Sequence, residues 1–230
     1  MNVLTPFQRD FLYSFFTQPA AAPFALTGGT ALAAFYLHHR LSEDIDLFAV
    51  APIADIKDTS LLDAGRMAAI AAAEIIGASY ETRLLSTTLQ QVFLTRAGEP
   101  RLKIDIVRDP GPLFGEVKEL DGIQVDSQLN IAVGKVNAIF GRTAARDFVD
   151  LYTLLHSGFD FDELFALAQQ KDPGLEEFYL SRMVRLVSRL TKDDLPTMLK
   201  PIDLEAIQRF FLDLADKLAD RANPTQWEQI

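Results

Sequence analysis

Two aspartates lie one residue apart inside the apolar stretch FALTGGTALAAFYLHHRLSEDIDLF, which covers residues 24–48. Side chains alternate between the faces of a strand, so Asp44 and Asp46 are predicted to share one face. Two carboxylates on one face repel each other unless a cation lies between them. Carboxylate oxygens suit Mg²⁺, which usually completes its shell with substrate phosphates. Alone, the pair favours solvated or salt-bridged aspartates at a strand end over a metal site.

A third aspartate, Asp105, lies in the apolar segment LKIDIV. If this segment is a strand beside the first one, Asp105 can reach the same cations from the side. Three carboxylates suffice for two metal ions, one orienting a triphosphate and one activating an attacking hydroxyl. We therefore expect Asp44, Asp46 and Asp105 to be metal ligands. The alternative for Asp105 is an edge-strand residue paired with Lys103 or Arg108.

A glycine pair lies before a helix-like segment in LTGGTAL. A strand is expected to enter a tight turn here, so that a phosphate can approach the backbone at Gly28 and Gly29. The hydroxyl of Thr30 is expected to point at that phosphate. The alternative is a plain strand-to-helix turn with Thr30 as N-cap. The motif is neither a Walker A loop nor the G-x-G-x-x-G of dinucleotide-binding folds.

The elements that must position these residues follow from the periodicity of apolar side chains. A first helix is expected to begin after the N-cap Thr5, with Pro6 at its first position, and to end near Thr17. A second helix is expected from about Thr59 to Gly77. Strands are predicted over residues 24–26, 44–50, 80–85, 91–96 and 102–107, with a further hairpin in 117–125 that turns at Asp121 and Gly122.

From Ser127 onward the pattern is helical, with five predicted helices and almost no strand signal. The predicted fold class is α+β, with a mixed α+β region over residues 1–126 and a helical domain over 127–230. The final residues, 223–230, are expected to fray.

The composition excludes several kinds of site and argues against several classes of protein. The 230 residues are 49% apolar, which allows a sizeable core, and the absence of cysteine excludes disulfides, zinc–thiolate sites and a cysteine nucleophile. No uncharged run reaches the roughly 18–20 residues that span a bilayer, so a cytoplasmic protein without a membrane partner is expected. The net charge of −10 argues against a broad nucleic-acid-binding surface. Adjacent helical side chains diverge by about 100°, which argues against joint metal ligation by His38 and His39, and both are interpreted as surface residues.

The combination of Gly-Gly-Thr, a short helix, Asp-Ile-Asp and a later strand with one aspartate resembles the polymerase-β-type nucleotidyltransferase superfamily. More narrowly, GGTALAAFYLHHRLSEDIDLF together with GKVNAIFGRTAARDFVDLYTLL resembles the AbiEii/AbiGii family of nucleotidyltransferase toxins. These are the toxic halves of type IV toxin-antitoxin and phage-defence pairs. The resemblance covers residues 24–155 and implies a mixed sheet with flanking helices, followed by a helical bundle. It also implies an NTP substrate, Mg²⁺ as cofactor and a cognate antitoxin as partner.

The resemblance also assigns site residues in the helical part. Lys135 in GKVNAIF and Asp147 in ARDFVD correspond to a lysine and an aspartate that complete the family's site, and a lysine there would contact the β- or γ-phosphate. Arg142 and Arg146 are further candidates for a phosphate, or for pairing with Asp147 and Asp150. Taken alone, each of these residues would be interpreted as a solvated helix charge.

The function that follows is transfer of a nucleoside monophosphate from an NTP to a hydroxyl, with release of pyrophosphate. The resemblance implies an RNA acceptor in some members, especially a tRNA 3′ end, while a protein or small-molecule acceptor stays open. A nucleotide-sugar glycosyltransferase with an Asp-x-Asp motif is one alternative. A non-catalytic nucleotide-binding module of the same fold is the other. The glycine pair and Lys135 favour the nucleotidyltransferase.

Overall fold

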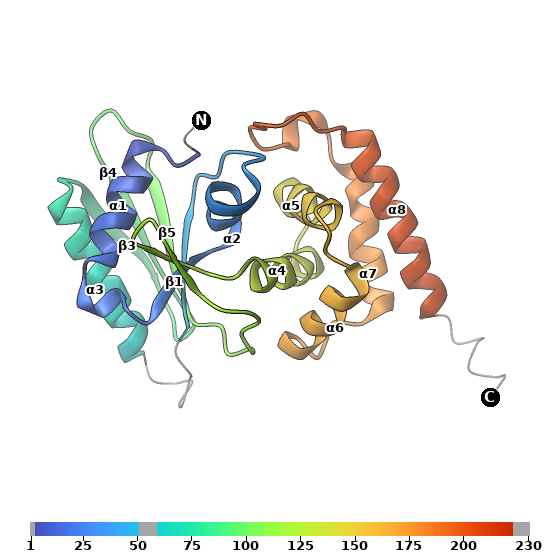
Figure 1. Ribbon diagram of the computed structural model, residues 1–230, viewed down its shortest axis with the longest axis horizontal. Helices are drawn as coiled ribbons and strands as arrows, with labels where there is room; N and C mark the ends of the chain where they lie inside the picture. The colour runs from blue at the N-terminus through green and yellow to red at the C-terminus, as the bar shows by residue number, and fades with distance from the viewer. Residues whose placement is uncertain (1–2, 51–58, 223–230) are drawn as a thin grey trace. The chain divides into compact units, whose positions relative to one another are not determined.

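The computed structural model describes residues 3–50 and 59–222 (Figure 1). The chain forms two compact units, Met1–Ile131 and Ala132–Ile230, and the division falls within helix α4 (Gln128–Gly141). The fraying expected for residues 223–230 lies outside the described residues.

The first unit contains a seven-stranded sheet in the order β3-β4-β5-β2-β1-β7-β6. The sheet is mixed, because β2 pairs in parallel with β5 and β1 with β7, while the other neighbours are antiparallel. This confirms the predicted mixed sheet. The strands are β1 (Phe24–Thr27), β2 (Ile45–Ala49), β3 (Ser79–Leu85), β4 (Leu89–Thr95), β5 (Leu102–Val107), β6 (Lys118–Leu120) and β7 (Ile123–Val125).

Helices α1 (Pro6–Phe16) and α3 (Ser60–Ile75) pack against one face of the sheet and against each other (Figure 1). The predicted N-cap Thr5 is confirmed, and it forms a capping box with Gln8. Phe15 of α1 packs edge-on against Phe24 of β1, with ring centroids 6.3 Å apart. Gly65 brings α3 close to the sheet, since a Cβ there would lie 2.5 Å from the Phe24 ring. The strand residues beneath these helices are apolar and buried, which leaves the opposite face for polar side chains.

The segment between β1 and β2 differs from the prediction in two ways. The glycine pair does not precede the helix but begins it, as α2 (Gly28–Ala31), which continues as a π-helical segment, η2 (Leu32–Leu37). Its N-cap position is Thr27 and not Thr30. His38 then adopts a left-handed conformation with φ of 50°, which redirects the chain. His39 is buried, so its interpretation as a surface residue was wrong.

The second unit is built from helices. They are the C-terminal part of α4, then α5 (Ala145–His156), α6 (Phe161–Lys171), α7 (Glu177–Val184) and α8 (Leu204–Arg221). Short 3₁₀ turns lie at η1 (Pro19–Ala21) in the first unit and at η3 (Arg185–Arg189) and η4 (Lys192–Asp194) in the second. The core of the second unit includes an edge-to-face contact between Phe148 of α5 and Phe211 of α8, whose ring centroids are 5.1 Å apart. Within the described ranges, no helix combines the length and apolar character needed to cross a membrane.

Candidate active site

A row of polar side chains crosses the sheet face opposite α1 and α3. Asp46 of β2 lies directly opposite Asp105 of β5, and Thr27 of β1 lies opposite Asp46 on its other side. The row extends to Gln91 of β4, which is opposite Asp105, and to Asp126, which directly follows β7. Directly opposed residues share a face, so the sheet itself brings these side chains together. We call Gln91, Asp105, Asp46, Thr27 and Asp126 the polar row.

Hydrogen bonds fix the two ends of the polar row. Gln91 Nε2 donates to Asp105 Oδ1 over 2.8 Å. At the other end, the Thr27 hydroxyl donates to Asp126 Oδ2 over 2.7 Å, and Asn130 Nδ2 donates to the same oxygen over 2.7 Å. Asp126 is only 4% exposed, so these donors replace the water that its carboxylate loses.

Asp44 lies immediately before β2 and not inside it, because the strand begins at Ile45. The backbone of this segment is held from two sides. Gln8 of α1 donates through Nε2 to the carbonyl oxygens of Ser42 and Glu43, at 2.8 and 3.2 Å. The Thr30 hydroxyl donates to the carbonyl oxygen of Asp44. Thr30 is 1% exposed, so its hydroxyl anchors Asp44 and does not point at a phosphate as we expected.

The glycine pair is closely covered by side chains that approach its Cα atoms. Gly28 has φ of +67°, and a Cβ there would lie 2.4 Å from Asp46 Oδ2. A Cβ on Gly29 would lie 2.3 Å from a terminal nitrogen of Arg40, which is itself buried and donates to the Leu41 carbonyl over 2.8 Å. Only glycine allows the Asp46 carboxylate and the Arg40 guanidinium to lie this close to the backbone.

A lysine ammonium lies where the sequence predicts a cation. Lys103 Nζ is 3.0 Å from Asp44 Oδ2 and 2.9 Å from Asp105 Oδ2. Burial lowers the pKa of Lys103, but hydrogen bonds to Asp105 and Asp44 and the charges of both outweigh burial and raise the pKa, so the amine is charged at neutral pH. The ion pair with Lys103 that we considered for Asp105 is thus present, although β5 is an interior strand and not an edge.

The residues around Lys103 fit a divalent cation by the chemistry of their donors. Carboxylate oxygens are hard ligands, and the Lys103 ammonium is a cation already accommodated between two of them. Across residues 3–50 and 59–222, however, no three acidic or histidine side chains gather in the geometry of a metal-binding group. Metal ligation by Asp44, Asp46 and Asp105 therefore stays a prediction.

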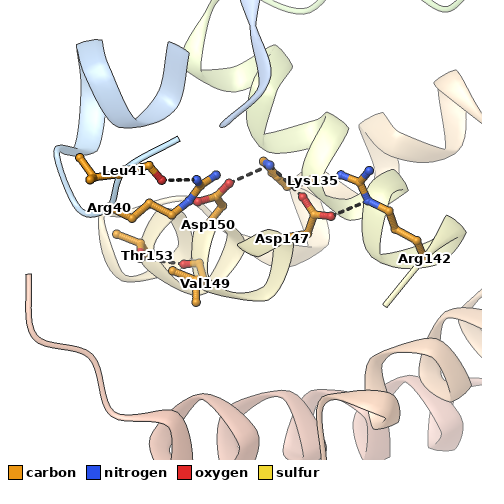
Figure 2. A network of polar contacts seen from close by, with 8 residues as sticks. All are labelled: Arg40, Leu41, Lys135, Arg142, Asp147, Val149, Asp150 and Thr153. Atoms are coloured by element: carbon orange, nitrogen blue, oxygen red, sulfur yellow. Dashed lines mark hydrogen bonds and ion pairs between the residues drawn. The ribbon is translucent and has the colours of Figure 1, made fainter. Parts of the chain in front are cut away.

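The helical unit contains a second charged cluster (Figure 2). Lys135 Nζ of α4 lies 2.9 Å from Asp147 Oδ1 and 2.7 Å from Asp150 Oδ2, both on α5. Both carboxylates are fully buried, and the Lys135 side chain is 8% exposed. Arg142 Nε donates to Asp147 Oδ2 over 2.8 Å. Arg146 is exposed on the first turn of α5.

These contacts differ from the solvated helix charges that the sequence alone would suggest for this cluster. Burial raises the pKa of Asp147, but the Lys135 charge and the hydrogen bonds from Arg142 and Lys135 outweigh it and lower the pKa. Lys135 is therefore not a solvated helix charge, because its ammonium is held between two buried carboxylates. The pairing of Arg142 with Asp147, one of the two options considered from the sequence, is present. A phosphate contact by Lys135, Arg142 or Arg146 stays a prediction.

Three members of the polar row could not be predicted from the sequence. Gln91, Thr27 and Asp126 carry no motif, and their place in the row depends on which strands pair and in which register. One local signal was available, since Asp126 and Ser127 follow an alternating strand and precede a helix, where a polar side chain commonly caps. Ser127 indeed accepts from the Asn130 backbone N–H, over 2.9 Å.

A family model described as "Nucleotidyl transferase AbiEii toxin, Type IV TA system" matches residues 10–229. The chain belongs to the AbiEii family. It is accordingly a nucleotidyltransferase toxin of the type IV toxin-antitoxin class, for which the family implies a nucleotide substrate and a cognate antitoxin. The recognition made from the glycine pair, the aspartates and the helical motif is confirmed. The match also decides against the glycosyltransferase alternative.

Solved structures share the fold of this AbiEii chain at low sequence identity. JHP933 from Helicobacter pylori has a TM-score of 0.55 at 19% identity, with 96% of this chain and 92% of that chain covered. A putative nucleotidyltransferase from H. pylori has a TM-score of 0.56 at 20% identity, covering 93% and 92%. MenT4, a nucleotidyltransferase toxin from Mycobacterium tuberculosis H37Rv, has a TM-score of 0.56 at 16% identity, covering 92% and 82%. No curated protein matches the sequence.

Proposed function

We propose that this AbiEii chain transfers a nucleoside monophosphate from an NTP to a hydroxyl at the 3′ end of a tRNA, with Mg²⁺ as cofactor. The observation that carries the proposal is the in-register pair Asp46 and Asp105, with the Asp46 carboxylate against a glycine that has no room for a side chain. A structural ion pair needs no such approach to the backbone, whereas a site for a phosphate and its counter-ion does.

In the proposed reaction, the acceptor oxygen forms a bond to the α-phosphorus while the bond from that phosphorus to the bridging oxygen breaks. Pyrophosphate leaves with the electron pair, and the hydroxyl proton passes through the Asp105 carboxylate to solvent. Mg²⁺ held by Asp44, Asp46 and Asp105 would offset the developing negative charge and make the hydroxyl more acidic.

Residues of the chain itself hold the Asp105 carboxylate and the backbone before β2 in position. Gln91 holds Asp105 Oδ1, and Gln8 and Thr30 hold the backbone on the N-terminal side of β2. The glycine pair lets the Asp46 carboxylate and the Arg40 guanidinium approach the backbone, and a triphosphate contact at Gly28 and Gly29 belongs to the proposal through the family resemblance. Such pre-organisation matters because a small misplacement of the reacting groups can slow a reaction strongly. Roles for Lys135, Asp147, Arg142 and Arg146 at the nucleotide belong to the proposal through the family resemblance.

The acceptor follows from the resemblance and not from charge, since the chain carries a net charge of −10. A tRNA end needs only a local contact with its terminal nucleotides, so a broad basic surface is not required. The partner that would restrain the toxin is a cognate antitoxin. A protein that acts on tRNA in this way is expected to work in the cytoplasm.

The test is incubation of the purified protein with each α-labelled NTP, Mg²⁺ and total RNA, followed by separation of RNA from protein. Label in the tRNA band is expected, and Asp46→Asn should abolish it while the protein still melts cooperatively. Asp193→Asn, at an exposed carboxylate of η4, is the matched control and should keep the activity.

Two results would overturn parts of the proposal. Wild-type turnover by Asp46→Asn would show that the proposed metal site takes no part in the transfer reaction. Label in protein instead of RNA would keep the nucleotidyl transfer and replace the acceptor. Absence of transfer to any acceptor, with NTP still bound, would favour the non-catalytic nucleotide-binding module.

A further inference from the structure

The contact made by Lys103 distinguishes it from an ordinary surface lysine. Its ammonium lies within 3.0 Å of carboxylates from two different segments, Asp44 before β2 and Asp105 on β5. Exposed salt bridges usually join two flexible side chains, but these three are only 26%, 25% and 15% exposed. The pair with Asp105 follows from the strand itself, because residues two apart on a strand share a face.

The two oxygens of Asp105 have different partners. Oδ1 accepts from Gln91 Nε2 over 2.8 Å, while Oδ2 accepts from Lys103 Nζ over 2.9 Å. Gln91 is neutral, so it can orient the Asp105 carboxylate without neutralising its negative charge. If the ammonium leaves, Asp105 keeps its orientation and gains one oxygen that can bind another cation. Asp44 is likewise held through its backbone, by Thr30.

We propose that Lys103 is a built-in counter-cation of the carboxylate site, which holds Asp44 and Asp105 together when no metal is bound and must leave them when a divalent cation enters. This inference rests on the metal site of the proposed function. Lys103 is then a positioning residue whose ammonium competes with the metal for the same oxygens. Its long, flexible and partly exposed side chain can swing away without disturbing the strand.

The consequence is that Lys103 weakens metal binding in the absence of nucleotide. A cation that already neutralises two carboxylates lowers the attraction that a divalent ion feels, and displacing it costs the two ion pairs. Removal of the ammonium should therefore tighten metal binding. An ordinary structural lysine predicts the opposite or no change, since its loss would disorder the carboxylates or leave them as they are.

The test is titration of the nucleotide-free protein with Mn²⁺, following the signal of free Mn²⁺ by electron paramagnetic resonance. Lys103→Met should bind Mn²⁺ at least about tenfold more tightly than wild type, which is about 1.4 kcal/mol. Lys103→Arg, which keeps a cation, should stay much closer to wild type. Lys103→Met/Asp105→Asn should lose the gain, because it lacks the oxygen that the metal would take.

Lys118→Met is the matched control for the loss of one positive charge. Lys118 is exposed on β6, four strands from β5 in the sheet order, or roughly 19 Å at the usual strand spacing. That separation exceeds the Debye length of about 8 Å at physiological salt. The Mn²⁺ affinity of Lys118→Met should therefore equal that of wild type. Lys103→Gln serves as a second variant if Lys103→Met does not fold.

Equal or weaker Mn²⁺ binding by a folded Lys103→Met or Lys103→Gln would overturn the inference. The measurement uses no NTP and no acceptor, so its outcome is separable from that of the transfer assay. Mg²⁺-dependent transfer together with an unchanged Mn²⁺ affinity would overturn the role of Lys103 alone. Tighter Mn²⁺ binding without any transfer would overturn the proposed function and leave the counter-cation in place.

Discussion

The Lys135 ammonium is enclosed between two carboxylates that are fully buried, those of Asp147 and Asp150. Taking three charges out of water is costly, and only their mutual attraction and hydrogen bonds offset that cost. Removing the Lys135 ammonium would take an ion pair from both buried carboxylates and leave Asp147 with Arg142, whose side chain is half exposed. The lysine is therefore integral to the helical unit, whatever else it contacts.

Lys135→Ala is expected to lower the free energy of unfolding by about 3–5 kcal/mol, the usual cost of breaking a buried ion pair. Urea denaturation followed by circular dichroism would measure the change. Lys192→Ala, at an exposed lysine of η4, is the control and should be nearly neutral.

The triple variant Lys135→Met/Asp147→Asn/Asp150→Asn should recover much of the lost stability, because it removes the charges together. A Lys135→Ala protein as stable as wild type would show that the ammonium contributes nothing to the fold.

Asp147 should make stability depend on pH on the acidic side. Its pKa in the folded chain is below the usual value of about 3.9, so folding favours the carboxylate form. The contribution is present above about pH 4 and is lost as the pH falls through the folded pKa. The stability difference between wild type and Asp147→Asn, measured from urea midpoints between about pH 7 and pH 3, should shrink as the pH falls. A constant difference down to pH 3 would contradict this account.

At the scale of elements, the turn from β1 into α2 is where the backbone limits the side chain most strictly. Gly28 combines a positive φ with a close neighbour, because a Cβ added to it would lie 2.4 Å from Asp46 Oδ2. Gly77, after α3, has nearly the same φ of +68°, but a Cβ there would meet no atom within 4 Å. A comparison of substitutions at the two glycines therefore separates the cost of a left-handed backbone from the cost of the clash with Asp46.

Gly77→Ala should cost about 1–2 kcal/mol, the usual penalty of a left-handed alanine, and keep nucleotidyl transfer. Gly28→Ala should cost more and abolish transfer, because the new methyl group displaces the Asp46 carboxylate. Thermal unfolding and the labelled-NTP assay would measure both effects. Equal losses in the two variants would mean that Asp46 moves aside at no cost.

Much of the element structure could be predicted from the sequence. The alternation in LKIDIV predicted residues 102–107, which are the bounds of β5, and Thr5 and Pro6 marked the start of α1. The glycine pair was misassigned as a turn, because Gly28 enters the helix with a positive φ that no local pattern reveals. Among the five helices predicted after Ser127, the segment GLEEFYLSRMVRLVSRL changes to a 3₁₀ turn after Val184, which its 3.6-residue pattern does not show.

The site was only partly predictable, for a different reason. The types and spacing of Asp44, Asp46 and Asp105 indicated a shared site, and parallel pairing of β2 with β5 brings Asp46 and Asp105 together. The contact of Lys103 with Asp44 depends on that same pairing, which a single sequence does not specify. Burial of Asp147 and Asp150 likewise depends on how α4 and α5 pack, so Lys135 looked like a solvated charge.

At the scale of the whole molecule, metal and nucleotide are expected to bind together. Mg²⁺ loses its waters reluctantly and usually needs substrate phosphates, while a triphosphate alone would face the aspartates without an added cation. Each ligand should therefore strengthen the other by the same factor. Thermal-shift titration of NTP should show a much larger stabilisation with Mg²⁺ than without it, and Asp46→Asn should remove the difference. Equal stabilisation with and without the metal would show that the aspartates do not mediate the coupling.

If the polar row is the catalytic site that we propose, it also determines when a growing chain can become toxic. The hydrogen bond between Thr27 and Asp126 joins residues 99 positions apart. Asp105 comes to lie opposite Asp46 only when β5 pairs with β2. Such distant contacts form late, since the intervening chain must first be made and closed into a loop. A ribosome-bound fragment that ends before residue 105 carries the glycine pair and Asp44 and Asp46 but lacks the third carboxylate. Synthesis therefore separates the appearance of the recognisable motif from the appearance of a complete site, and truncated translation products should be harmless.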